Sequence, residues 1–193
     1  QHDEKSTELP GPQKQLSEIT QNVGTENADV LKNEAFVPER VEDALAQKPY
    51  GLVHIATHGQ FAGDIEDSFV MAYQKKLKMT QLEELMRIRR FSDQPIELLT
   101  LSACQTAAGD DRAALGLSGI AIKAGARSAV GTLWPSYDRP TAQLITEFYA
   151  QLADTSASKA KALQEAQKKM LQSNTELEHP AFWAPFLLIG NWL

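Results

Sequence analysis

The sequence has a single cysteine, Cys104, among its 193 residues. One cysteine cannot form an intrachain disulfide, and it cannot build a zinc site from several thiolates. A lone thiol is typical of a reducing compartment, where it can stay reactive. We therefore expect a cytoplasmic protein with no cysteine-based metal site.

Long apolar runs and a signal peptide are also missing. The longest apolar runs have the length of a strand, so we expect no segment that spans a membrane. Residues 1–14 are polar, lack the apolar stretch of a signal peptide and do not begin with methionine. We interpret residues 1–14 as a flexible lead-in, and residues 15–193 as one domain from a longer chain.

An excess of positive charge is absent as well. The 25 acidic residues outnumber the 19 basic ones, which gives a formal net charge of −6. Such a surface does not attract phosphate backbones, so nucleic acid is not expected as a direct partner. Gly109, Gly116 and Gly119 do not have the spacing of a phosphate-binding loop, and a dinucleotide site is not expected either.

Short apolar segments alternate with amphipathic segments along the chain. We expect strands over residues 52–57, 68–73, 96–103, 127–134 and 186–189. We expect helices over residues 15–21, 37–47, 115–124, 141–152 and 158–171, and one that starts at a capping box of Thr80 and Glu83. The alternation predicts an α/β fold with a largely parallel sheet covered on both sides.

Two residues with useful chemistry follow predicted strands directly. His58 and Cys104 come at carboxyl ends, where open α/β sheets bind their ligands. A thiol is a strong nucleophile once a base takes its proton, and a neutral imidazole can be that base. A lone cysteine can equally be a small core residue. Gly59, next to the histidine, would let a substrate carbonyl approach the backbone N–H.

The other histidines have simpler interpretations. His54 lies inside its strand, so we expect it to be buried and hydrogen-bonded in the core. His179 precedes a proline and is expected to cap a helix or form a turn. His2 belongs to the lead-in.

Four motifs resemble one known family. HIATHG at residues 54–59, LLTLSACQTAAG at 98–109, GLSGIAIKAGARSAVGTLWPSYD at 116–138 and HPAFWAPFLLIGN at 179–191 follow one another in the order found in the CHAT domain. This family of caspase-like cysteine peptidases often follows tetratricopeptide repeats in bacteria and is related to separases, metacaspases and caspases. The resemblance covers roughly residues 50–190.

The resemblance implies a caspase-hemoglobinase-like fold, a three-layer α/β/α sandwich with a mostly parallel central sheet. It implies a Cys-His dyad with His58 as base and Cys104 as nucleophile, and an oxyanion hole formed by the backbone N–H groups of Gly59 and Cys104. It implies no metal and no organic cofactor. The expected partners are a protein or peptide substrate and a regulatory repeat domain or partner protein.

Some features stay open at this point. Asp138 could bind an arginine before the cleaved bond, as the basic preference of related separases and metacaspases suggests, or it could cap the following helix. Gln105 could shape the cleft or pack away from it. The domain could instead be a catalytically silent interaction module, or a thiol hydrolase acting on a non-peptide acyl group. The strand that usually opens the family is missing here, and a bare strand edge invites pairing.

Overall fold

The structure is a computed structural model, and it describes residues 10–61, 65–87, 94–102, 105–106, 125–134, 136–154 and 156–193. The helix predicted at residues 115–124 lies outside this part of the chain, and so does Cys104. No helix within the described ranges is long and apolar enough to cross a membrane.

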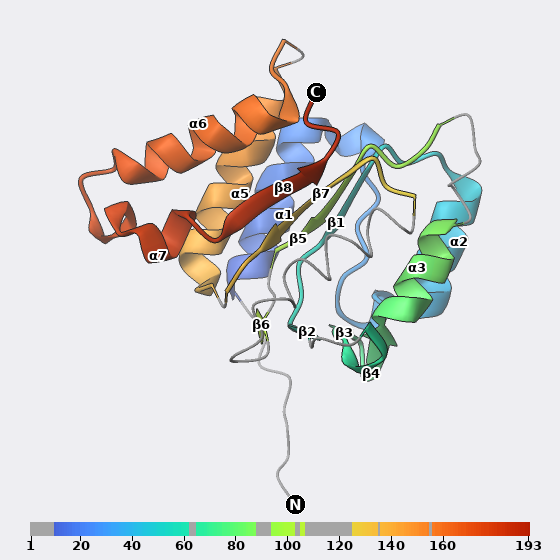
Figure 1. Ribbon diagram of the computed structural model, residues 1–193. Helices are drawn as coiled ribbons and strands as arrows, with labels where there is room; N and C mark the ends of the chain where they lie inside the picture. Colours follow the sequence, from blue (N-terminus) through green and yellow to red (C-terminus); the bar gives the residue numbers. More distant parts are fainter. Residues whose placement is uncertain are drawn as a thin grey trace, which may run out of the picture.

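A four-stranded central sheet runs through the described part of the chain, in the order β1-β5-β7-β8 (Figure 1). Its strands are β1 (Leu52–Ile55), β5 (Leu98–Leu101), β7 (Ser128–Thr132) and β8 (Phe186–Gly190). β1, β5 and β7 are parallel, and β8 is antiparallel to β7. The predicted α/β fold with a mostly parallel sheet is confirmed, and the carboxyl ends of three strands meet at one edge.

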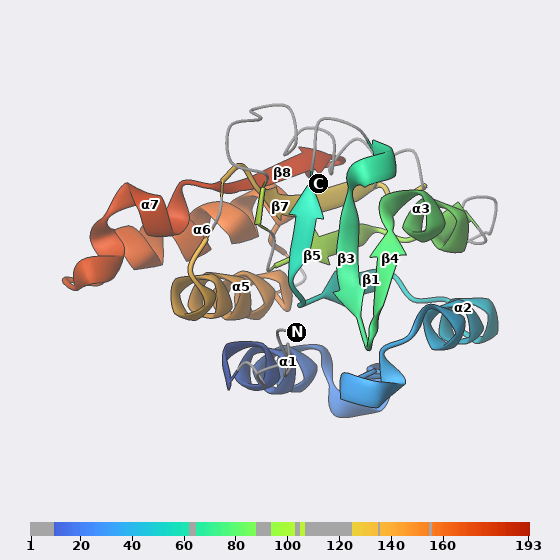
Figure 2. The same ribbon diagram turned by 90° about the horizontal axis from the view of Figure 1, so that it is seen from below.

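Helices cover both faces of this sheet, with α1 beside α5 on one side and α2 near α3 on the other (Figure 2). The helices are α1 (Pro10–Val23), α2 (Pro38–Gln47), α3 (Met79–Arg87), α5 (Asp138–Leu152), α6 (Lys159–Leu171) and the short α7 (Pro180–Trp183). Single 3-10 turns lie at Thr25–Asn27, Asn33–Ala35, Ile65–Asp67 and Glu176–Glu178.

Alternation along β5 gives the two faces different cores, because successive side chains of a strand point to opposite sides. Leu99 and Leu101 pack in the apolar core that includes residues of α2 and α3. Leu98 packs with residues of α1, α5 and α6. Thr100 is fully buried on that second side, where its Oγ1 accepts a hydrogen bond of 3.0 Å from the Tyr149 hydroxyl.

A second, smaller sheet with the order β4-β3-β2-β6 was only partly predicted. Its strands are β4 (Lys75–Lys78), β3 (Phe69–Ala72), β2 (Gly59–Phe61) and β6 (Gln105–Thr106). β3 matches the strand expected at residues 68–73. β4 has the sequence KKLK, in which Leu77 is the buried residue, so it lacks the apolar pattern of a strand. The turn into β4 places Gln74 at a φ of 53°, without the glycine that usually marks such turns.

Two helices begin earlier than the sequence pattern indicates. α1 starts at Pro10, so residues 10–14 belong to a helix and not to the expected flexible lead-in. Pro10 and Pro12 fit the first turn because its N–H groups have no partner within the helix. α3 starts at Met79, ahead of Thr80, and the Gln81 side chain accepts a 3.0 Å hydrogen bond from the Lys78 N–H. The capping box predicted with Glu83 is therefore replaced by this contact.

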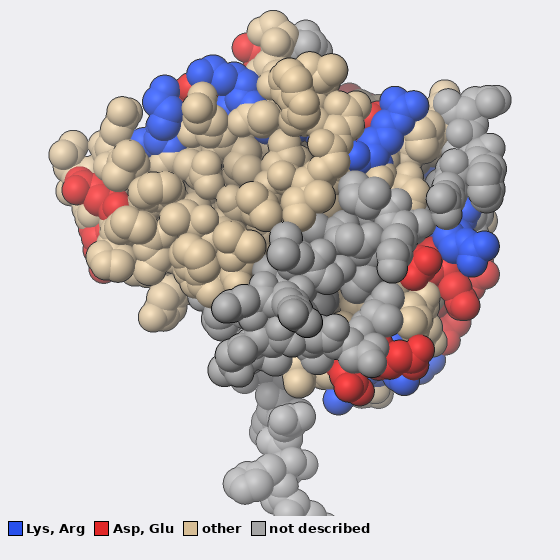
Figure 3. All heavy atoms as spheres, viewed as in Figure 1, with Lys and Arg blue, Asp and Glu red and all other residues tan. Residues whose placement is uncertain are grey.

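Charged side chains of both signs adjoin on the side of the molecule where α2 and α3 lie (Figure 3). One ion pair of this region joins Lys75 of β4 to Glu39 of α2 at 2.9 Å. Both side chains are largely exposed, so this pair contributes little to stability.

Candidate active site

His58 lies in the short connection between β1 and β2, and its side chain is exposed at the carboxyl edge of the central sheet. Met71 of β3 holds this connection in place. The Met71 N–H donates to the His58 carbonyl at 2.7 Å, and the Thr57 hydroxyl donates to the Met71 carbonyl at 2.6 Å. The backbone around the histidine is thus fixed while its imidazole faces outward.

The peptide group between His58 and Gly59 has a defined direction. Its carbonyl points toward β3, where it accepts from Met71. Because a trans peptide holds C=O and N–H on opposite sides, the Gly59 N–H points away from β3. β6 is the neighbour of β2 on that other side. Gly59 is buried and adds no side chain that would cover its N–H.

Cys104 lies outside the described residues, but described residues flank it in the sequence. Before it, the Ser102 N–H donates to the Ile55 carbonyl at 3.1 Å and extends the pairing of β5 with β1. After it, Gln105 of β6 is paired with Gln60 of β2. In the sequence, His58 lies between Ile55 and Gln60, the residues that pair with Ser102 and Gln105. Nothing is described of the Gln105 side chain, so its predicted place in the cleft is not tested.

His54 has a very different environment. The expected hydrogen bond is present, but the side chain is half-buried and also lines a cavity, so the residue is not fully buried in the core. Its Nε2 lies 3.0 Å from Ser102 Oγ, and its ring packs edge-on against Tyr149 at 5.5 Å between centroids. Its Nδ1 is buried without a hydrogen-bond partner. Burial lowers the pKa of the His54 imidazole to about 3, because the charged form would be desolvated. Such a weak base cannot serve as a proton acceptor near neutral pH.

Asp138 is the first residue of α5 and is exposed beyond the carboxyl end of β7. The expected N-cap role is wrong by one residue: Tyr137 occupies the cap position, and no side chain caps the helix. Asp138 still favours the helix, since a carboxylate in the first turn interacts well with the helix dipole. Its position at the same edge as His58 keeps the substrate-binding role as a hypothesis.

Two contributions to this edge were missed by sequence reasoning, the hydroxyls of Thr57 and Ser102. For Ser102, the sequence does contain a signal, which is the alternation of side chains along a strand. It places Thr100 and Ser102 on one face of a strand whose other face is formed by Leu99 and Leu101. Two polar side chains on one buried face predict hydrogen-bond partners across that face. His179, by contrast, was predicted correctly: its Nδ1 accepts from the Ala181 N–H and caps α7.

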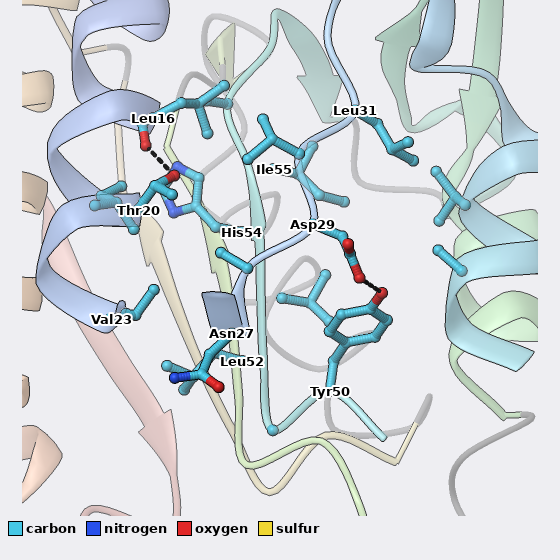
Figure 4. A pocket seen from close by; sticks show the side chains of 18 of the residues that line it. Leu16, Thr20, Val23, Asn27, Asp29, Leu31, Tyr50, Leu52, His54 and Ile55 are labelled. Atoms are coloured by element: carbon cyan, nitrogen blue, oxygen red, sulfur yellow. Dashed lines mark hydrogen bonds between the residues drawn. The ribbon is translucent and has the colours of Figure 1, made fainter. Parts of the chain in front are cut away.

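A cavity of about 520 Å³ lies along β1 (Figure 4). α1 contributes apolar side chains such as Leu16 and Val23, the segment after it contributes Leu31, and β1 contributes Leu52 and Ile55. β1 is the edge strand of the described central sheet, so the bare edge raised by the family resemblance is present. Within the described residues, no cluster of three or more His, Cys, Asp or Glu side chains could hold a metal ion.

The fold and its edge define an α/β domain with an exposed histidine between two anchored strands. The family model described as the CHAT domain matches residues 1–191. The chain therefore belongs to the CHAT domain family, which is caspase-like. A comparison with curated proteins finds no match.

Proposed function

We propose that this protein is a cysteine endopeptidase in which Cys104 and His58 form the catalytic dyad. The observation that carries the proposal is the pairing on both sides of the two residues. Just before the two residues in the sequence, the Ser102 N–H donates to the Ile55 carbonyl. Just after them, Gln60 is paired with Gln105. Membership in a caspase-like family gives this pairing its chemical interpretation.

In the proposed reaction, His58 takes the Cys104 proton, and the thiolate attacks the carbonyl carbon of the scissile peptide. The C–N bond breaks as the imidazolium returns its proton to the leaving amine, which leaves a thioester on Cys104. Water, activated by the neutral imidazole, then hydrolyses the thioester and restores the thiol. No metal or redox partner is needed to balance these steps.

The oxyanion formed in both steps needs preorganised donors. The Gly59 N–H points away from β3 and toward the side of β6, so it is the first donor that we propose. The Cys104 N–H is the second, as the family resemblance implies. One such donor contributes about 3 kcal/mol to stabilisation of the transition state.

The test is cleavage of a fluorogenic peptide library by the wild type and by Cys104→Ala, with an electrophilic peptide probe alongside. The probe is unusually informative, because a single cysteine leaves one thiol to label. We expect cleavage after one class of residue and labelling of one site, both lost in Cys104→Ala. A preference for basic residues would support Asp138 as part of the substrate pocket.

His179→Ala is the matched control, since it removes an imidazole that caps α7 and leaves the dyad intact. We expect it to keep full cleavage. A wild type that neither cleaves peptides nor takes the probe would contradict the proposal and favour an interaction module. Turnover of small thioesters without peptide cleavage would favour a hydrolase of other acyl groups.

A further inference from the structure

Ser102 joins the ends of β1 and β5 in two ways. Its N–H donates to the Ile55 carbonyl at 3.1 Å, and its Oγ lies 3.0 Å from His54 Nε2. Ser102 is only 1% exposed, and His54 is half-buried. Ser102 precedes Cys104 by two residues and His54 precedes His58 by four, so the contact joins the two segments that lead to the members of the proposed dyad.

One arrangement of the protons uses both side-chain contacts of Ser102. The Ser102 hydroxyl donates to Gln15 Oε1 of α1 at 3.4 Å, so its oxygen is free to accept from the His54 Nε2–H. The neutral imidazole then carries no proton on its unpartnered Nδ1. The reverse arrangement would bury an Nδ1–H donor without a partner.

We propose that Ser102 and His54 are positioning residues, whose side-chain hydrogen bond holds the carboxyl ends of β1 and β5 together and sets the Cys104 thiol against His58. This proposal rests on the dyad proposed above. A bond between neighbouring parallel strands near their carboxyl ends limits how far the segments that follow them can separate. Loss of this bond should weaken the coupling of the Cys104 thiol to the His58 imidazole and should leave substrate binding largely unchanged.

Thr100 provides a matched control on the same face of β5. It is also fully buried, and its hydroxyl bonds to Tyr149 of α5 instead of to β1. Thr100→Val and Ser102→Ala each remove one buried hydroxyl. The Thr100 hydroxyl has Tyr149 as its side-chain partner, whereas the Ser102 hydroxyl contacts both Gln15 of α1 and His54 of β1. Only Ser102→Ala removes a bond between the two strands that lead to His58 and Cys104.

The test uses alkylation of Cys104 by iodoacetamide as a function of pH, since the rate reports the thiolate fraction of the only thiol. We expect the single substitution His58→Ala to lower the alkylation rate at neutral pH about tenfold. It should also shift the pH profile of alkylation to higher pH. Ser102→Ala should lower the rate by a similar factor, Thr100→Val should stay within about twofold, and Ser102→Thr should restore it. In the Ser102→Ala background, His58→Ala should change the rate by less than about twofold.

Peptide cleavage and thermal unfolding are measured on the same variants. We expect Ser102→Ala to lower kcat with little change in KM, at a melting temperature close to that of Thr100→Val. Equal alkylation rates in Ser102→Ala and Thr100→Val would overturn the proposal, as would a wild-type rate that does not depend on His58. If the coupling between Ser102 and His58 is present but no peptide is cleaved, the positioning role stands and the peptidase proposal fails.

Discussion

His54 and His58 are four residues apart in one segment, yet the sheet interior and the sheet edge give them opposite properties. His54 contacts residues of two other segments: one ring nitrogen lies against Ser102, and the ring makes a T-shaped contact with Tyr149 of α5. His58 is exposed, and its backbone carbonyl accepts a hydrogen bond from Met71 of β3. The same side chain is therefore a neutral structural group at one position and a candidate base at the other.

The difference follows from where β1 ends. Ile55 is the last residue of the strand, so His54 is packed within the sheet and His58 lies beyond it. Burial removes the solvation that a charged imidazole needs, and it drives the pKa of His54 down. The side chain of His58, beyond the end of the strand, is exposed to solvent. Two substitutions, His58→Ala and Tyr149→Phe, and a pH series on the stability that comes from His54 test this difference.

The largest effect is expected from His58→Ala. Loss of the base should lower kcat/KM for peptide cleavage about 10³-fold. The free energy of unfolding should stay within about 0.5 kcal/mol of the wild type, because the side chain is exposed. Cleavage kinetics and urea unfolding of the same preparation test both parts. A variant that keeps its activity would remove His58 from the dyad.

The features of His54 and His58 that depend on local sequence could be predicted, and those that depend on tertiary pairing could not. The strand around His54 and the position of His58 beyond it follow from a short apolar run bounded by glycine, and both were predicted. β2, β4 and β6 were not, because their sequences GQF, KKLK and QT carry no apolar period. These strands are stabilised by their pairing with β3 and with each other.

The contact between Ser102 and His54 shows the other limit. The polar pair Thr100 and Ser102 on one face of β5 predicts that partners exist, but not which ones. The choice of His54 depends on the register of β1 against β5, which pairs it with Thr100. Register is a tertiary property, and a single sequence does not specify it. The dyad itself was predicted from motif and strand ends, and Cys104 remains outside the described residues.

The next largest effect is a dependence of stability on pH that comes from His54. Its folded pKa of about 3 lies below the ordinary value of 6.5, so the unfolded chain takes up a proton first as the pH falls. The stability is fully present above the unfolded pKa and is lost toward the folded pKa, at up to about 1.4 kcal/mol per pH unit. Between about pH 7.5 and pH 5 we expect a loss of about 2 kcal/mol in urea unfolding.

His54→Gln is the control for this series, because it keeps a polar side chain that does not titrate. Over the same range its unfolding free energy should change much less than that of the wild type. His58→Ala should keep the wild-type dependence, since it leaves His54 and its contacts in place. An equal slope in the wild type and His54→Gln would mean that His54 can take up a proton in the folded protein.

The smallest effect is expected from Tyr149→Phe. This variant tests the ring contact with His54 and the hydrogen bond to Thr100 separately. The variant keeps the edge-on ring at 5.5 Å from His54 and loses the hydroxyl that donates to Thr100 Oγ1. We expect a loss of about 1 kcal/mol, much of it because the buried Thr100 hydroxyl is left without its donor. Tyr149→Phe combined with Thr100→Val removes both partners and should therefore cost little more than either single change. Fully additive losses in urea unfolding would show that the two hydroxyls do not depend on each other, and the polar face of β5 would then consist of independent contacts.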